Sequence, residues 1–151
     1  MSTNHTLHSV DETHQLAQEI THQILSGDIP SVLLLSGDLG GGKTTFTQGV
    51  GQALGLSGPI PSPTYTIIRP YALPPLNPPV FTQLIHADLY RIKAPWEAEE
   101  LELAQYAIDP ATILIVEWPE KSPQLWESIP HTQLTFTVPS PDQRIIQITT
   151  H

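Results

Sequence analysis

Residues 32–46 read VLLLSGDLGGGKTTF and contain the strongest structural signal in the chain. The first four residues are apolar and follow a turn, as expected for a strand that is covered on both faces within a parallel sheet. Residues 37–44 match the pattern GxxxxGK followed by Ser or Thr, and residues 44–54 repeat an apolar side chain every fourth position, which indicates a helix. This order of strand, glycine-rich turn and helix predicts a loop that binds phosphate groups.

Each part of this loop has a physical reason. Glycines leave room for backbone N–H groups to converge on phosphate oxygens, and the amino end of the helix adds a favourable dipole. Lys43 can reach the outer phosphates, and the hydroxyl of Thr44 can bind Mg²⁺. The residues expected to contact the phosphates are Gly37, Asp38, Leu39, Gly40, Gly41, Gly42, Lys43, Thr44 and Thr45. The alternative is a glycine-rich turn without a ligand. It does not explain why a lysine stands in the turn, since Lys and Arg are rare up to position 92, where only Arg69 and Arg91 accompany Lys43.

A nucleotide site of this type also needs a carboxylate for Mg²⁺ and a group that positions the attacking water. Glu117 directly follows an apolar run at residues 113–116, which is the place of a metal-linked acid beside the phosphate-binding strand. Asp88 follows residues 81–87, a strand with less regular patterning. Either acid could instead be an exposed loop residue. The expected catalytic residues are Glu117, Asp88 and Lys43, and the expected metal ligands are Thr44, Glu117 and Asp88.

Three further side chains are open to two interpretations. Thr64, before the next strand, is either a switch hydroxyl that senses the γ-phosphate or the start of a strand fixed by the preceding proline. His86 projects from its strand on the same face as Asp88 and could form a metal pair with it, although a structural histidine fits better because no third ligand is near. Trp118 either walls the nucleotide pocket or fills a gap.

The rest of the chain predicts helices and strands on both sides of the loop. Ser9 followed by Glu12 is a capping box, and an apolar stripe then predicts a helix that Gly27 ends. Gly49 and Gly51 weaken the helix after the loop, and we expect them to pack closely on the sheet. The other expected elements are an edge strand at 5–9, antiparallel strands at 64–71 and 80–86, a helix from Pro95, a helical turn at 123–128, and a strand pair at 133–138 and 144–149. The Pro-rich segment 72–79 is either a ligand for a polyproline groove or a stiffened surface loop.

Composition excludes several classes of protein. The 151 residues fit one domain, over residues 1–151. The 6 Lys and Arg against 15 Asp and Glu give a formal net charge of −9, which argues against direct binding to nucleic acid or to an anionic membrane. No apolar run approaches the roughly 18 residues of a membrane span. The absence of Cys excludes disulfides, thiol catalysis and zinc–thiolate sites, and we expect a cytoplasmic protein.

Two missing features narrow the reaction class. The chain has no Asn-Lys-x-Asp motif, so it lacks a standard reader of guanine. A small-molecule kinase needs a lid with several arginines, whereas this chain has only Arg69, Arg91 and Arg144. The sequence therefore favours slow ATP hydrolysis or a non-hydrolysing, nucleotide-gated binding module, with a small-metabolite kinase as a third alternative.

Four segments of the chain resemble the bacterial TsaE family. They are GDLGGGKTTF at 37–46, SPTYT at 62–66, HADLYR at 86–91 and IVEWPE at 115–120, in the order and spacing of that family. The first segment is common to phosphate-binding loops in general. The third and fourth together are nearly specific to the family.

This resemblance implies an α/β, three-layer fold of the P-loop NTPase type, with a mixed, mainly parallel central sheet flanked by helices. It implies binding of ATP or ADP with Mg²⁺ and a weak, partner-stimulated ATPase. It also implies a role in the threonylcarbamoyladenosine (t6A) modification of tRNA, through a complex with TsaB and TsaD rather than by direct tRNA binding. It assigns Thr64 to the switch, Trp118 and Arg144 to the surroundings of the nucleotide, and residues 10–13 to adenine. The family usually has a glycine after the acidic helix. In this chain residues 103–105, Leu-Ala-Gln, occupy that position.

Overall fold

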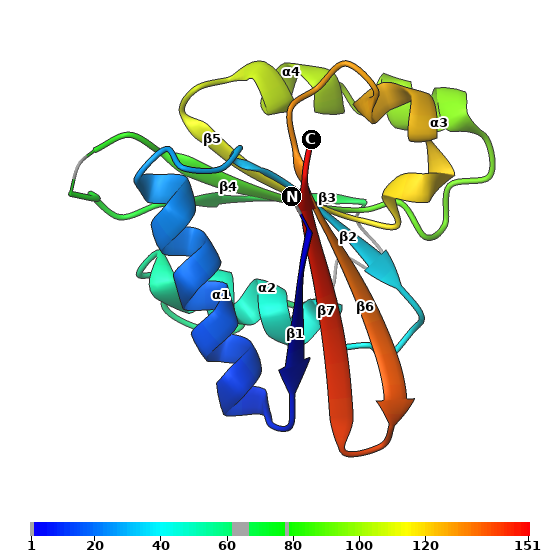
Figure 1. The fold of residues 1–151 in the computed structure, drawn as a ribbon. Coiled ribbons are helices and arrows are strands. Elements are labelled where there is room, and N and C mark those ends of the chain that lie inside the picture. The colour runs from blue at the N-terminus through cyan, green and yellow to red at the C-terminus, as the bar shows by residue number, and fades with distance from the viewer. Residues whose placement is uncertain (1, 62–66, 78) are drawn as a thin grey trace.

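A computed structural model describes residues 2–61, 67–77 and 79–151 (Figure 1). Its strands are β1 (Ser2–Leu7), β2 (Val32–Gly37), β3 (Ile68–Ala72), β4 (Gln83–Asp88), β5 (Thr112–Glu117), β6 (Thr132–Ser140) and β7 (Gln143–Thr150). Its helices are α1 (Val10–Leu25), α2 (Lys43–Ala53), α3 (Pro95–Glu100) and α4 (Leu103–Ile108), with the 3-10 turns η1 (Pro119–Lys121) and η2 (Pro123–Trp126). The predicted switch residue Thr64, with the rest of the segment 62–66, lies outside the described residues.

The seven strands form one mixed sheet in the order β1-β7-β6-β2-β5-β4-β3. The central strands β6, β2, β5 and β4 are parallel, whereas β1, β7 and β3 run antiparallel to their neighbours. Helices α1 and α2 cover one face of the sheet, and α3, α4 and the 3-10 turns lie on the other (Figure 1). The expected three-layer α/β fold with a parallel centre is therefore confirmed. None of the described helices is long and apolar enough to cross a membrane.

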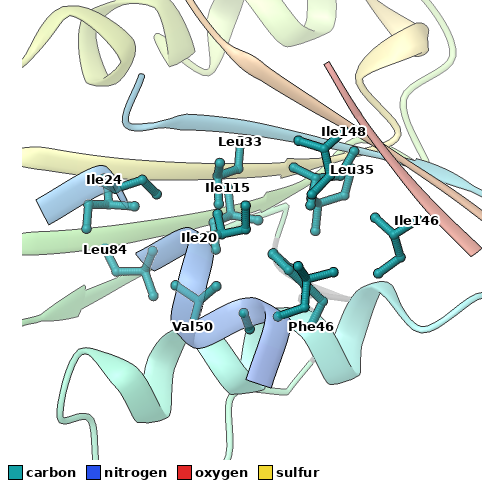
Figure 2. Packing of buried hydrophobic residues seen from close by; sticks show 14 of the residues in the cluster. Ile20, Ile24, Leu33, Leu35, Phe46, Val50, Leu84, Ile115, Ile146 and Ile148 are labelled. Carbon is teal, nitrogen blue, oxygen red and sulfur yellow. The ribbon is translucent and has the colours of Figure 1, made fainter. Parts of the chain in front are cut away.

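Strand β2 is apolar along most of its length because both of its faces are buried. Leu33 and Leu35 lie in the core on the side of α1 and α2, together with Phe46 (Figure 2). Val32 and Leu34 belong to a second apolar cluster on the opposite face. Full burial of one such side chain contributes roughly 1.5–3 kcal/mol relative to its exposure. The unbroken apolar run is thus the mark of a central strand.

The turn between edge strand β1 and helix α1 contains the predicted capping box. The Oγ of Ser9 accepts a hydrogen bond from the N–H of Glu12 at 3.1 Å. The Glu12 carboxylate in turn accepts a hydrogen bond from the N–H of His8 at 2.7 Å, one residue before the N-cap. Both bonds hold this turn in place, which matters because the turn borders the candidate site.

The two glycines inside α2 do not serve the purpose that we expected. A Cβ on Gly49 would lie 2.7 Å from the Cβ of Ala17 on α1, and a Cβ on Gly51 would overlap the side chain of Ile60. The expectation of close packing on the sheet is therefore wrong. Helix α2 packs against α1, the following loop and the sheet. The two glycines face α1 and the loop. Phe46 and other apolar residues of α2 face the sheet.

The segments around the Pro-rich loop also differ in part from expectation. Strands β3 and β4 pair antiparallel as predicted, but β4 begins at Gln83, so residues 80–82 precede the strand. Leu76, in the middle of the loop, packs against the core. This contact favours a stiffened surface loop over a ligand for a polyproline groove, although Pro78 lies outside the described residues.

The acidic segment that begins at Pro95 forms two short helices that meet at Glu102. Pro95 occupies the first turn of α3, as predicted. Glu102 has a φ of 58°, which lies in the left-handed region. An L-residue pays roughly 1–2 kcal/mol for this conformation, whereas glycine adopts it freely. The backbone is therefore strained at Glu102, directly before residues 103–105.

Glu102→Gly should raise the free energy of unfolding by about 0.5–1 kcal/mol, because relief of the left-handed strain exceeds the added freedom of the unfolded chain. Glu100→Gly is the matched control. Glu100 is an exposed acid and the last residue of α3, and its replacement should lower stability by up to about 0.5–1 kcal/mol. Urea denaturation of the three proteins measures both effects, and equal losses in the two variants would contradict the strain at Glu102.

Gly49→Ala should lower the free energy of unfolding by roughly 1–3 kcal/mol, because the new methyl group would overlap Ala17. Helix propensity alone predicts the opposite sign, a gain of about 1 kcal/mol. Gln52→Ala, at an exposed position of the same helix, supplies the control for propensity. A Gly49→Ala protein as stable as the Gln52→Ala protein would show that the two helices can separate without loss.

Candidate functional site

The glycine-rich pattern forms the turn between β2 and α2. Gly40 and Gly42 have φ values of 78° and 101°, in the left-handed region that favours glycine. Gly37 is required for a different reason, because a Cβ there would lie 2.5 Å from the carbonyl oxygen of Phe136 on β6. The first glycine of the pattern therefore permits the close approach of β6, a role that the sequence alone does not distinguish from phosphate contact.

Lys43 is the first residue of α2 and is only 5% exposed. Its Nζ donates hydrogen bonds to the carbonyl oxygens of Gly37 and Asp38 and lies 4.4 Å from the centre of the Trp118 ring. Burial lowers the pKa of Lys43 below the usual range of lysine. The carboxylates that oppose this shift belong, in order of effect, to Glu117, Glu120, Asp88 and Asp38.

The two predicted acids lie side by side at the carboxyl edge of the sheet. In the parallel register of β4 and β5, Asp88 is opposite Glu117. The Oδ1 of Asp88 accepts a hydrogen bond from the backbone N–H of Tyr90 at 2.9 Å, on an exposed turn. Glu117 is 3% exposed, and its Oε2 lies 2.8 Å from Nε2 of the fully buried His86. The sequence suggested a structural histidine, and its partner is the acid of the neighbouring strand.

Trp118 packs in the core and also lines a cavity at the loop. It has a φ of 59°, and its backbone N–H donates to the carbonyl oxygen of Leu35 at 3.1 Å. Its ring lies 5.0 Å from the ring of Tyr90 and packs against the second core cluster. The same residue lines the cavity described next. It therefore joins the end of β5 to the end of β2 while forming part of the wall.

These groups meet at a cavity of about 440 Å³. The predicted residues that line it are Leu39, Gly40, Gly42, Lys43, Thr44, Thr45, Asp88, Glu117, Trp118 and Arg144. Among the described residues, Gly37, Asp38 and Gly41 belong to the same loop but are not part of the lining. The guanidinium of Arg144 donates to the carbonyl oxygens of Pro141 and Gln143, each at 3.2 Å.

Part of the lining comes from turns that carry no binding motif. Val10 and Thr13 line the cavity; that residues 10–13 border adenine, as the family resemblance implied, stays a prediction. The lining residues that the sequence did not predict are Leu7, His8, Ser9, Pro141 and Asp142. They lie at the β1–α1 turn and the β6–β7 turn. These turns are near the loop because the strand order β1-β7-β6-β2 brings them there. A single sequence gives no signal for that order.

A second cavity, of about 600 Å³, lies between the end of β2, strand β6 and the 3-10 turns. Its walls include Leu34, Trp126 and Ile129, together with the acids Glu120 and Glu127. Within the described part of the chain, no lysine, arginine or glycine-rich loop lines it. It is larger than the first cavity, but its charge is wrong for a polyphosphate, so the cavity at Lys43 is the candidate site.

A metal ion would need ligands beyond the protein here. Across residues 2–61, 67–77 and 79–151, no group of three or more His, Cys, Asp or Glu side chains is placed to hold a metal ion. The pair of His86 and Asp88 therefore finds no third ligand in these residues. Thr44, Asp88 and Glu117 offer oxygen donors at one cavity, and phosphate oxygens would complete such a set.

Comparison with known proteins leads to one family. The family model described as "Threonylcarbamoyl adenosine biosynthesis protein TsaE" matches residues 7–146. The tRNA threonylcarbamoyladenosine biosynthesis protein TsaE of Synechocystis sp. is 40% identical over 122 residues, which are 79% of this chain and 71% of that protein. The protein of the same name from Streptomyces coelicolor is 36% identical over 107 residues, which are 70% of this chain and 66% of that protein.

A solved structure extends this similarity to three dimensions. The crystal structure of Bacillus subtilis YdiB superposes with a TM-score of 0.74 at 27% identity, covering 99% of this chain and 86% of that one. The region matched by the family model includes every described residue that lines the cavity at Lys43. The chain belongs to the TsaE family of threonylcarbamoyl adenosine biosynthesis proteins.

Proposed function

We propose that this chain binds ATP or ADP with Mg²⁺ in the cavity at Lys43, hydrolyses ATP slowly, and supports the t6A modification of tRNA for which its relatives are named. The observation that carries the proposal is the meeting of Lys43, Asp88 and Glu117 at a glycine-rich loop that begins a helix. One buried cation and two carboxylates at such a loop suit a magnesium–phosphate complex better than an uncharged ligand.

The loop supplies the groups that a polyphosphate needs. Lys43 would exchange its carbonyl acceptors for charged phosphate oxygens, which accept stronger hydrogen bonds. The amino end of α2 and the N–H groups of the loop add positive potential. A phosphate beside Lys43 would also counteract the burial that lowers the pKa of this side chain, and so favour its charged form.

The two acids fit the remaining requirements. Thr44, Asp88 and Glu117 carry the hydroxyl and carboxylate oxygens that Mg²⁺ prefers. When bound, the ion would neutralise negative charge on the phosphates. Glu117 or Asp88 would orient the attacking water. Trp118 and Val10 line other parts of the cavity, where adenine would be accommodated.

We further propose that the activity depends on TsaB and TsaD. Only three arginines are present in the chain, and of these Arg144 lines the described cavity. A slow phosphoryl transfer can be accelerated by a partner that supplies positive charge or orders the site. The net charge of −9 makes direct tRNA binding unfavourable, which also favours action through partners. A role in tRNA modification would place the protein in the cytoplasm.

Lys43→Ala should weaken ADP binding by about tenfold or more, because it removes a charge-assisted hydrogen bond worth roughly 1.5–3 kcal/mol. Lys93→Ala removes the same charge from an exposed position and should leave the dissociation constant within about twofold. Calorimetric titration of the three proteins with Mg²⁺–ADP measures the difference. Equal affinities for wild type and Lys43→Ala would exclude the loop as the phosphate site.

Addition of TsaB and TsaD should stimulate ATP turnover, and Glu117→Gln should abolish most of that stimulation while ADP binding persists. The amide keeps the size of the side chain and an oxygen that can accept from His86, but it loses the charge needed for Mg²⁺ and water. Glu100→Gln, an exposed acid of α3, is the control. Release of phosphate is the readout.

Two outcomes separate the proposal from its rivals. Tight nucleotide binding with turnover that is unchanged in Glu117→Gln would favour a non-hydrolysing, nucleotide-gated module. No stimulation of wild type by TsaB and TsaD would argue against the partnership, whatever the intrinsic rate.

A further inference from the structure

His86 is a polar side chain in a place where the sheet is otherwise apolar. It lies in the middle of β4 and is 0% exposed. Leu84, two residues earlier on the same face of β4, and Ile115, opposite His86 on β5, are equally buried and belong to an apolar cluster. Burial of an imidazole in such surroundings is unfavourable unless a hydrogen bond compensates for it. The bond at 2.8 Å between its Nε2 and Oε2 of Glu117 is that compensation.

The hydrogen-bond partners of the ring assign its proton. A carboxylate oxygen only accepts, so Nε2 of His86 carries the hydrogen. Nδ1 is buried and finds no hydrogen-bond partner among the described residues. An unpaired lone pair at Nδ1 is easier to bury than an unpaired N–H group. The bond therefore runs from Nε2–H of His86 to Glu117.

This bond completes the fixation of Glu117. The backbone of Glu117 is already fixed, because β5 pairs with β2 at Leu35 and with β4 at Asp88. Its side chain still has three rotatable bonds, and the donor from His86 anchors one of its two oxygens. The other oxygen is then left for the cavity that Glu117 lines.

We propose that His86 is a positioning residue, whose Nε2–H holds Glu117 in the rotamer that presents one carboxylate oxygen to the nucleotide cavity. The inference rests on the proposed function in one respect, namely that Glu117 binds magnesium or orients the attacking water.

The test compares two replacements of His86. His86→Leu fills a similar volume but has no donor, whereas the amide of His86→Gln can reach Glu117 with an N–H. Loss of a residue that orients a metal-linked ligand typically lowers activity by roughly 10–100-fold. His86→Leu should therefore lower kcat of the TsaB–TsaD-stimulated ATPase at least about tenfold, and His86→Gln should restore it to within about threefold of wild type.

Two further measurements separate positioning from general damage. ADP affinity without Mg²⁺ should stay within about twofold in both variants, because the phosphate loop is unchanged. Ile85→Val, a buried change next to His86, should leave kcat unaltered. Equal loss of kcat in His86→Leu and His86→Gln, or a normal kcat in His86→Leu, would overturn the proposal. If His86→Leu does not fold, His86→Asn, which is polar but too short to reach Glu117, takes its place.

A crystal structure of the leucine variant, or of the asparagine variant in its place, decides the inference even if the proposed function fails. Wild type that neither binds nor hydrolyses ATP would refute the proposed function alone. Even in that case, loss of the donor from His86 should move the Glu117 carboxylate from its wild-type position or let it occupy more than one rotamer. A Glu117 side chain that is unmoved in the variant would overturn the role of His86.

Discussion

The parallel pairing of β5 with both β2 and β4 is the constraint on which the site depends. It aligns Glu117 with Leu35 on β2 and with Asp88 on β4, so both acids arrive beside the loop that follows β2. The carboxyl ends of parallel strands share one edge, where α/β proteins bind their ligands. A slip of β5 by one residue would turn Glu117 to the other face of the sheet, away from Lys43. The apolar residues of β2 and β5 form the core on both faces of the sheet, so the same strands build the core and the site.

The features that could be predicted from the sequence are those encoded locally. The loop at residues 37–44 is contiguous, and the apolar run before Glu117 marks a central strand whose end must lie near that loop. The approach of Val10 depends on the strand order β1-β7-β6, which no local pattern contains. The packing of Gly49 on α1 was mispredicted because a helical stripe identifies an apolar face but not which neighbour a glycine meets. The bond from His86 to Glu117 joins residues that are 31 positions apart in the chain, and it forms only in the register that pairs β4 with β5.

Among the described residues, the buried side chains that can carry a charge lie where the loop, β4 and β5 converge. Lys43, His86 and Glu117 are each almost fully buried, and each has a hydrogen-bond partner within the same region. Such groups lower stability relative to apolar residues unless their partners are well placed. Their concentration at one edge of the sheet is therefore better explained by the chemistry of the cavity than by folding, since elsewhere the core around β2 is apolar.

The balance of charge around Lys43 argues for a cation in the proposed site. Four carboxylates already act on this one ammonium group, and a nucleotide would add the charges of its phosphates. Repulsion among these anions is stronger in a partly buried cavity than in water, because the effective dielectric constant is lower. The amino end of α2 offers only about half a positive charge. A divalent ion between phosphates and carboxylates would remove the largest repulsion, so nucleotide affinity and metal binding should be coupled. In the proposed function, the acidity of the site would attract the metal ion, and the metal ion would allow an acidic protein to hold a polyphosphate.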